Sequence, residues 1–309
     1  MEFKHIPVLL NECIEGLKIK PDGIYVDGTL GGAGHSSKIA EKLSKTGILI
    51  GIDRDEEALK AAKNRLKEFD NIKYIHGNHD EIRNILKELK IDKVDGILLD
   101  LGVSSYQLDE ASRGFSYMSN SKLDMRMDRT SKLTAEEIVN TYSEKELSKI
   151  LFEYGEEKFA NRIANKICEY RKEKRIETTQ ELTQIVEKAI PKKMQNEGHP
   201  AKRTFQAIRI EVNNEIEPLY NTILDCIDAL KPSGRLCVIT FHSLEDRAVK
   251  NAYADANGKC TCPPGLPYCA CGAKKIGNII NKKPIIASDD EQKQNSRSKS
   301  AKLRIFEKI

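Results

Sequence analysis

Glycine and acidic residues recur along this chain at the spacing of a nucleotide-type binding site. Residues 24–35 (IYVDGTLGGAGH) predict a short buried strand, a glycine-rich turn and the start of a helix. Glycines at four of seven positions let the backbone turn sharply and approach a ligand closely. Asp53 follows Gly34 by nineteen residues, at the end of the apolar run 47–52. Because a carboxylate there can accept both hydroxyls of a ribose, the pair of features favours ligand binding over an ordinary tight turn.

The glycine pattern departs from the dinucleotide fingerprint by one residue. That fingerprint requires G-x-G-x-x-G, and Ser37 stands where the third glycine would follow Gly32 and Gly34. The departure argues against a nicotinamide-dependent oxidoreductase, which stays open as an alternative. An acidic residue before a run of glycines resembles instead the first motif of S-adenosylmethionine-dependent methyltransferases.

Two further candidate residues follow the next expected strands. His79 comes after the expected strand 71–76, and Asp100 ends the apolar strand 94–101. Ligands of such folds bind at the carboxyl ends of the strands, where both residues would lie. A carboxylate is costly to bury without a partner, so Asp100 is a strong candidate. His79 is either a ring that stacks on an adenine or an exposed loop histidine.

Strands that alternate with helices predict the fold that positions these residues. Apolar segments at 24–27, 47–53, 71–76 and 94–101, with amphipathic helices between them, predict a doubly wound parallel sheet in an α/β fold. Residues 235–241 predict a fifth strand, and 299–308 an edge strand that closes the chain.

The alternation breaks between the fourth and fifth strands. About 130 residues separate them, whereas a crossover with its helix takes about 30. Residues 134–190 have helical periodicity and few β-forming residues, so we expect an inserted all-helical domain at 106–203. The sheet domain would then be discontinuous, formed by 1–105 and 204–309. We expect a long helix over 206–230, kinked at Pro218, to lead back to it.

Composition and charge indicate where the protein is located and what kind of partner it binds. Hydrophobic residues make up 39% of its 309 residues, with no apolar run near 18 residues and no signal-peptide core at the start. We therefore expect a cytoplasmic protein without a membrane segment. The net charge of +4 is uneven, because residues 258–309 hold 11 Lys and Arg against 4 Asp and Glu. This basic tail indicates a polyanionic partner, a solvated terminus, or both.

Four of the eight cysteines lie close together in the sequence. Cys260, Cys262, Cys269 and Cys271 form a CxC-x6-CxC pattern with prolines between the pairs. Four thiols at this separation can hold a tetrahedral zinc ion, although C-x2-C is the usual spacing. Reduced or reversibly oxidised cysteines remain the alternative.

Six motifs, in order along the chain, resemble the MraW-type family of 16S ribosomal RNA cytosine-N4 methyltransferases. They are 27–36 (DGTLGGAGHS), 98–105 (LLDLGVSS), 113–116 (RGFS), 123–128 (LDMRMD), 204–210 (TFQAIRI) and 241–247 (FHSLEDR). The resemblance runs from Lys4 to the final strand. It implies a class I, Rossmann-like methyltransferase fold whose helical insertion recognises the substrate.

The resemblance also implies a cofactor, contact residues and partners. The cofactor is S-adenosylmethionine, and the substrate is a decoding-centre cytidine of 16S rRNA, naked or in the small ribosomal subunit, with no DNA partner. The implied cofactor contacts are Ala33, Gly34, His35, Asp53, His79, Asp100 and Gln107. Position 79 departs from the family, in which we expect phenylalanine. A non-catalytic RNA-binding protein is a further alternative, but such a protein needs no complete cofactor cradle.

The residue that accepts the proton of the amine stays open at this point. A cytosine amine needs orientation and an acceptor for an N–H rather than an enzyme nucleophile. The candidates are Asp100, Asp124, Asp128, His242 and backbone carbonyls near Gly102. Residues 123–129 can equally be a surface loop with internal salt bridges. In 241–247 we expect His242, Glu245 and Arg247 to position RNA or hold the cleft walls, and Ser243 to cap a helix with Asp246.

Overall fold

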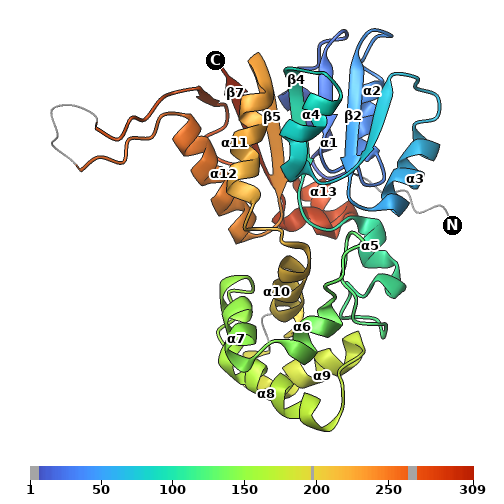
Figure 1. Ribbon diagram of the computed structural model, residues 1–309, viewed down its shortest axis with the longest axis vertical. Helices are drawn as coiled ribbons and strands as arrows, with labels where there is room; N and C mark the ends of the chain where they lie inside the picture. Colours follow the sequence, from blue (N-terminus) through green and yellow to red (C-terminus); the bar gives the residue numbers. More distant parts are fainter. Residues whose placement is uncertain (1–6, 196–197, 264–269) are drawn as a thin grey trace. The chain divides into compact units, whose positions relative to one another are not determined.

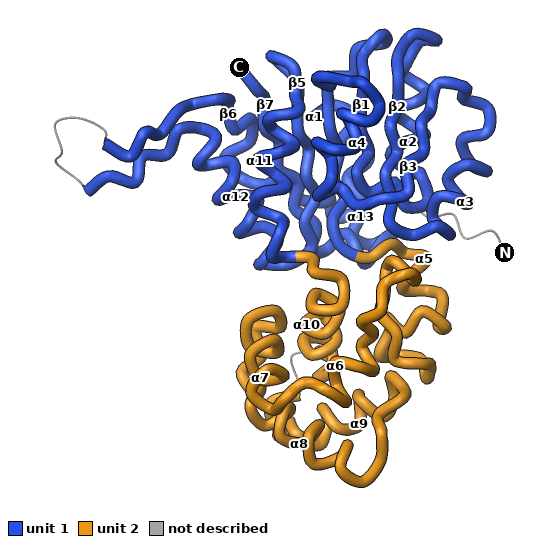
Figure 2. Tube along the Cα trace, in the orientation of Figure 1, with its two compact units in different colours: residues 1–102, 216–309 blue, residues 103–215 orange. Residues whose placement is uncertain are grey.

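The chain forms two compact units, one of which is inserted into the other. A computed structural model describes residues 7–195, 198–263 and 270–309. Met1–Gly102 and Ile216–Ile309 together form one unit, which we call the sheet unit. Val103–Glu215 forms the second, the helical unit (Figure 2).

The sheet unit contains a seven-stranded sheet whose order reverses in the middle. The strands lie in the order β3-β2-β1-β4-β5-β7-β6, and β1 to β5 run parallel. Their bounds are Ile24–Asp27 (β1), Ile48–Asp53 (β2), Ile72–His76 (β3), Val94–Asp100 (β4), Leu230–Thr240 (β5), Gly277–Ile279 (β6) and Lys302–Lys308 (β7). The predicted doubly wound, Rossmann-like α/β class is confirmed. The final strand, however, is not at the edge as predicted, because β6 pairs antiparallel with its outer side.

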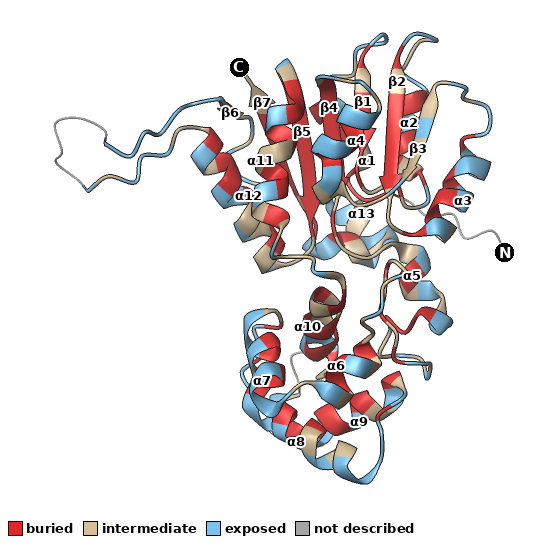
Figure 3. Cartoon of the chain, in the orientation of Figure 1, coloured by how far each residue is buried: buried red, intermediate tan, exposed pale blue. Residues whose placement is uncertain are grey.

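Alternate side chains of the strands enter two separate cores. Leu49, Leu98 and Ile239 pack against α1 (Leu10–Leu17) and α2 (Gly34–Ala40). Their neighbours Ile50, Leu99 and Val238 face α4 (Ile82–Glu88), α11 (Leu219–Ala229) and α12 (Ser243–Ala256). Because side chains of a strand alternate between its faces, a continuous apolar run is what a sheet covered on both faces requires. The buried strands between helices are visible in Figures 1 and 3.

Two further helices, α3 and α13, belong to the sheet unit. Helix α3 (Glu56–Arg65) is capped by Asp55, whose carboxylate accepts the Glu57 N–H at 3.0 Å. Its apolar face, including Leu59 and Ala62, packs against Leu30 of the glycine-rich turn. Helix α13 (Asp289–Gln294) precedes β7.

The helical unit has its own apolar core. Its helices are α5 (Ser105–Asp109), α6 (Ala135–Thr141), α7 (Glu144–Glu153), α8 (Ala160–Glu173), α9 (Thr179–Ala189) and α10 (Lys202–Asn213). Buried apolar residues of α6 to α10 form one cluster with Phe115, Leu123 and Met125 of the preceding loop. In the part of the chain that the structure describes, no helix is both long enough and apolar enough to cross a bilayer.

The end of the helical unit differs from the sequence-based boundary. The unit extends to Glu215 rather than to residue 203, because Phe205, Ile208 and Val212 of α10 join its core. The predicted single helix over 206–230 is wrong. Asn214 ends α10 in the left-handed conformation (φ 48°), and Pro218, which has no N–H to donate, directly precedes α11.

Candidate functional site

Three acidic residues end three neighbouring strands at the point where the strand order reverses. Asp27 ends β1, Asp53 ends β2 and Asp100 ends β4. Parallel strands carry their carboxyl ends to the same edge, and β1 lies between β2 and β4. This edge is the topological switch point at which open α/β sheets bind ligands.

The glycine-rich turn after β1 is hydrogen-bonded to both neighbouring strands, β4 and β2. Gly28 donates its N–H to the Leu98 carbonyl at 2.9 Å, and Leu30 donates to the Ile52 carbonyl at 3.0 Å. A Cβ at Gly28 would lie 2.5 Å from Leu99 Cδ2 and 3.1 Å from the Cβ of His79. Only glycine therefore allows the turn to lie this close to β4 and to His79. Ala33 then adopts a left-handed conformation (φ 57°) directly before α2, which begins at Gly34.

Asp53 fixes the turn from the end of β2. One carboxylate oxygen accepts the Gly31 N–H at 2.7 Å and the other accepts the Asp55 N–H at 2.8 Å. Each oxygen keeps a lone pair for a ligand hydroxyl. Burial raises the pKa of Asp53 to about 6, against the lowering effect of these two hydrogen bonds. The side chain is half-buried, so a ligand can still reach it.

Asp100 has a different environment. Its Oδ1 atom is buried and has no hydrogen-bond partner among the described residues, while its backbone N–H donates to Thr29 Oγ1 at 2.6 Å. Burial, with the negative charges of Asp27 and Glu245, raises the pKa of Asp100 to about 8. The free protein therefore holds a largely protonated carboxyl at neutral pH, in an environment that favours a cationic ligand.

His35 faces Asp100 without supplying a positive charge. Its Nδ1 lies 3.8 Å from Asp100 Oδ2, and its Nε2 lies 3.0 Å from the Val8 carbonyl oxygen. Because a carbonyl oxygen only accepts, Nε2 carries the ring proton. Burial lowers the pKa of His35 to about 4, so the ring is neutral at physiological pH.

Asp27 and Thr29 complete the site, although neither is among the residues predicted from the sequence. The Asp27 carboxylate accepts hydrogen bonds from Ser36 Oγ at 2.7 Å and from the Thr29 N–H at 3.2 Å. Burial raises the pKa of Asp27. In the sequence, the position of Asp27 between the apolar strand and Gly28 could have indicated this supporting role.

His79 begins a short 3-10 turn after β3 (His79–Glu81) and lies beside Gly28. Burial, followed by the positive charge of Arg54, lowers the pKa of His79 to about 3, so this ring is also neutral. A neutral imidazole provides a flat face for stacking. The adenine contact of His79 stays a prediction.

The turn from β5 into α12 is capped one residue earlier than predicted. His242, not Ser243, is the N-cap residue, and Glu245 accepts the backbone N–H groups of Phe241 (2.7 Å) and His242 (3.3 Å). Glu245 Oε1 also lies 3.0 Å from His242 Nε2. Asp246, the predicted capping partner, instead pairs with Arg304 of β7 at 2.6 Å. Both acidic side chains are therefore fixed by partners within the sheet unit.

The remaining predicted residues belong to the helical unit. Gln107 Oε1 accepts the Ser104 N–H at 3.0 Å and closes the first turn of α5. Arg126 donates to both oxygens of Asp124 at 2.8 Å and lowers the pKa of that carboxyl. Asp128 accepts from the Thr130 N–H at 2.8 Å and from its hydroxyl at 2.7 Å. The structure thus brings together Ala33, Gly34, His35, Asp53, His79 and Asp100 in one unit, and Gln107, Asp124 and Asp128 lie in the other.

Three of the four clustered cysteines lie near one another. The ligand atoms of Cys260, Cys262 and Cys271 are all within 4.8 Å of one another. Cys269 lies outside the described residues.

Comparison with known proteins gives matches over the whole chain. The MraW methylase family matches residues 2–309. Ribosomal RNA small subunit methyltransferase H of Clostridium botulinum (strain Kyoto / Type A2) is 60% identical over 309 residues, which is 100% of both chains. The protein of the same name from Lachnospira eligens is 57% identical over 311 residues, covering 100% of this chain and 99% of the other. Among solved structures, an rRNA methylase from Streptococcus thermophilus covers 99% of each chain with 13% identity and a TM-score of 0.42.

Proposed function

The chain belongs to the MraW methylase family, and on that premise we propose that it is an S-adenosylmethionine-dependent enzyme that methylates the N4 amine of a decoding-centre cytidine in 16S rRNA. Relatives that are 57–60% identical over their full length bear the name ribosomal RNA small subunit methyltransferase. The choice of the N4 amine follows from the motif resemblance. The substrate is the rRNA or the small ribosomal subunit, and we infer that the enzyme meets it in the cytoplasm.

The cofactor assignment is based mainly on Asp100, a buried acidic residue at the switch point. Asp100 has a buried oxygen without a partner among the described residues, and its neighbours Asp27 and Glu245 are acidic. S-adenosylmethionine carries a positive sulfonium and a positive ammonium, whereas the nicotinamide cofactors carry a negatively charged pyrophosphate. An acidic site beside a glycine turn therefore fits the methyl donor better than it fits a dinucleotide.

The residues of the sheet unit divide into distinct roles in this proposal. Asp53 accepts hydrogen bonds from the ribose hydroxyls, because each of its oxygens keeps a lone pair beyond its backbone bond. The turn at Ala33 and Gly34 passes close to the cofactor, and His79 stacks on the adenine. Asp100 binds the cationic end. Gln107, from the helical unit, supplies a further contact in this proposal.

The bound cofactor supplies an electrophilic methyl group, and the amine of the cytosine attacks it. That amine is a weak nucleophile because its lone pair is delocalised into the ring, so it must be oriented and its N–H must meet an acceptor. Of the four candidate side chains, Asp124 is the weakest acceptor, because Arg126 lowers the pKa of its carboxyl. Asp128 accepts two hydrogen bonds from Thr130 at Oδ1, which leaves Oδ2 for a further donor. Asp100, Asp128 and His242 therefore stay candidates.

We assign substrate recognition to the helical unit and to the basic segment after α12. The helical unit interrupts the crossover between β4 and β5 and has a core of its own, so it can vary without disturbing the sheet. Residues 257–287 contain five lysines and no acidic residue, which suits them to contact phosphates.

A labelled-methyl transfer assay tests the proposal. The full chain is incubated with S-adenosylmethionine carrying a labelled methyl group and with 16S rRNA or small subunits from cells that lack this methylation. We expect the label in N4-methylcytidine, identified by mass and by comparison with standards after digestion to nucleosides. Label in 5-methylcytidine would contradict the assigned atom. Calorimetry that detects binding of a nicotinamide cofactor but not of S-adenosylmethionine would favour the oxidoreductase, and cofactor-free RNA binding would favour a pure binding protein.

A further inference from the structure

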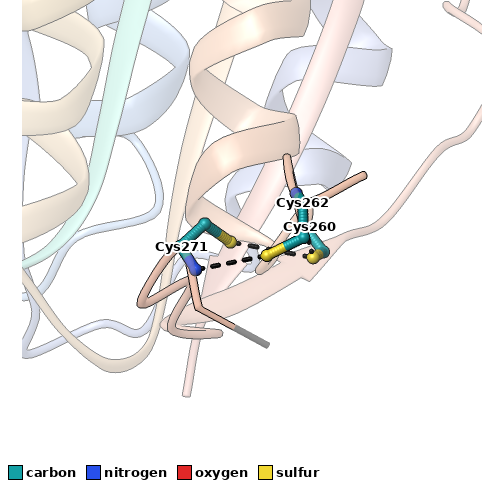
Figure 4. Close-up of side chains that lie close together, drawn as sticks. All are labelled: Cys260, Cys262 and Cys271. Atoms are coloured by element: carbon teal, nitrogen blue, oxygen red, sulfur yellow. Dashed lines mark hydrogen bonds between the residues drawn. The ribbon is translucent and has the colours of Figure 1, made fainter. Parts of the chain in front are cut away.

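Three cysteines on a projecting segment form a cluster that methyl transfer does not explain. The segment leaves the end of α12 and returns to β6, and we call its described parts, residues 257–263 and 270–276, the arm (Figure 1). Cys260 and Cys262 lie on the outgoing part and Cys271 on the returning part (Figure 4). From their geometry we propose that Cys260, Cys262 and Cys271 form a thiolate site for a divalent zinc ion that ties the two parts of the arm together.

The sulfur–sulfur distances suit a metal rather than a disulfide. Cys260 Sγ and Cys271 Sγ are 3.7 Å apart, and the three sulfur atoms all lie within 4.8 Å of one another. Tetrahedral zinc with metal–sulfur bonds of about 2.3 Å places its sulfur ligands about 3.8 Å apart. A disulfide requires about 2.05 Å between the two sulfur atoms. The observed spacing leaves room for an ion between the thiols.

Backbone N–H groups point at the sulfur atoms. Cys262 Sγ accepts from the N–H groups of Ala270 at 3.2 Å and of Cys271 at 3.3 Å, and Cys260 Sγ accepts from the Cys262 N–H at 3.4 Å. Hydrogen bonds to sulfur stabilise the negative thiolate, which is the form that binds metal. Gly272 follows with φ 67°, a left-handed conformation that turns the chain immediately after Cys271.

The arm has no apolar core that could hold it in place. Of its described residues from Lys259 to Ile276, every one except Cys262 is exposed. Its base is closed by an antiparallel bridge between Asn257 and Lys275 and by the Ile276 N–H, which donates to the Ala256 carbonyl at 2.9 Å. Small units without a core are usually held by a metal or a disulfide. A bound zinc ion would supply the missing constraint further out along the arm.

Binding is balanced by proton release. Each of the three thiols loses one proton to solvent as its sulfur bonds to the ion, so affinity rises with pH. Water or another group of the chain occupies the fourth position of the tetrahedron. Cys269 completes the CxC-x6-CxC pattern in the sequence, but it lies outside the described residues, so the proposal is built on the other three.

Metal content tests the site directly and without any activity measurement. The full chain is purified under reducing conditions without added zinc, and its metals are measured by mass spectrometry. We expect one equivalent of zinc in the wild type and in Cys168→Ser, a matched control whose cysteine lies in α8. The combined variant Cys260→Ser, Cys262→Ser, Cys271→Ser should lose it. Equal zinc in the combined variant and the wild type, or none in the wild type even after incubation with zinc, would overturn the proposal.

Cobalt and trypsin provide two further measurements. Metal-free protein titrated with Co²⁺ should show thiolate-to-cobalt charge-transfer absorption, which the combined variant should lack. Trypsin cleavage after Lys259, Lys274 and Lys275 should slow roughly a hundredfold when zinc is present at a hundred times its dissociation constant. A cobalt spectrum without thiolate bands, or cleavage that zinc does not slow, would contradict it. Because none of these readouts involves methyl transfer, the result is independent of the proposed function.

Discussion

The carboxyl groups that end β2 and β4 have different protonation states because their partners differ. Two backbone N–H groups favour the charged form of Asp53 and hold its pKa to about 6 despite burial. Among the described residues no donor reaches Asp100 Oδ1, and the negative charges of Asp27 and Glu245 add to burial in raising the pKa of Asp100 to about 8. At pH 7 Asp53 is therefore mostly ionised and can accept hydrogen bonds. Asp100 is mostly protonated and becomes an anion when a cation binds beside it.

Replacing Asp53 tests the ribose contact. Asp53→Ala should weaken S-adenosylmethionine binding by about 1.5–3 kcal/mol, the range for a hydrogen bond to a charged group. Titration calorimetry measures the change, with Asp70→Ala, an exposed acidic residue of the same unit, as the control. Unchanged affinity in a folded Asp53 variant would exclude the assignment.

The raised pKa of Asp100 predicts pH-dependent cofactor binding. Below about pH 8 the carboxyl must lose its proton when it pairs with the cationic cofactor, so affinity should rise with pH by up to about tenfold per unit and level off above pH 8. Asp100→Asn should bind weakly and show little of this dependence. Calorimetry between pH 6 and 9, in buffers of different ionisation enthalpy, measures both affinity and proton release. A wild type without pH dependence would contradict the prediction.

The raised pKa of Asp100 also makes folding stability depend on pH. This dependence is opposite in sign to that of cofactor affinity, and the Asp100→Asn variant tests it. The pKa of Asp100 is higher in the folded protein than the value of about 3.9 expected when unfolded, so the folded state holds the extra proton. Its contribution to the free energy of unfolding therefore falls as pH rises from about 4 to about 8. Asp100→Asn should consequently gain stability relative to the wild type over this window, as measured by urea unfolding at several pH values.

Single residues were predictable from the sequence where a strand ended on a polar side chain. Asp53 and Asp100 were found that way, because a parallel sheet collects the ends of its strands at one edge. The hydrogen bonds of Asp27 and Thr29 were not predicted, since they depend on how the turn folds back. The salt bridge between Asp124 and Arg126 agrees with the alternative of a loop with internal salt bridges, although Leu123, Met125 and Met127 of that loop are buried rather than on the surface.

At the scale of elements, the entry into α12 depends on one buried acidic side chain. Glu245 accepts the N–H groups of Phe241 and His242 and is only 2% exposed. Glu245→Ala would leave these donors without their acceptor, at a cost of about 1–3 kcal/mol of unfolding free energy. Denaturant unfolding measures the loss, and Glu245→Gln, which keeps an acceptor oxygen, should recover part of it. Equal stability of all three proteins would show that the cap is dispensable.

The sequence predicted which apolar segments form strands and which amphipathic segments form helices. It did not predict which strands lie side by side or where one helix ends and the next begins. The strand at the end of the chain was correctly expected, but its place inside the sheet depends on the three-residue β6, too short to stand out in the sequence. In the sequence, the apolar residues of α10 and α11 form one continuous helical pattern. The break between them depends on the left-handed Asn214, a conformation that a local pattern does not specify.

At the scale of the whole molecule, the division into units predicts separable functions. Replacing 103–215 with a flexible Gly–Ser linker should leave the sheet and both of its cores intact, because none of their described buried residues lies in the helical unit. The shortened protein should retain part of its S-adenosylmethionine binding and lose rRNA methylation. Calorimetry and the labelled-methyl assay measure the two properties. Methylation at the rate of the full chain would show that the helical unit is not required for substrate recognition.

The uneven charge of the whole molecule predicts how its RNA affinity depends on salt. Lys274, Lys275, Lys282 and Lys283 are exposed in a stretch that contains no acidic residue. Each lysine that contacts a phosphate displaces a condensed counterion, so changing all four to Gln should flatten the plot of log K against log salt by roughly one unit per lost contact. Filter binding of 16S rRNA at several salt concentrations measures the slope. Changing four other exposed lysines of the sheet unit, Lys42, Lys60, Lys67 and Lys87, removes the same net charge and should leave the slope nearly unchanged. If both variants flattened the slope equally, the RNA would be responding to net charge alone and not to a defined basic surface.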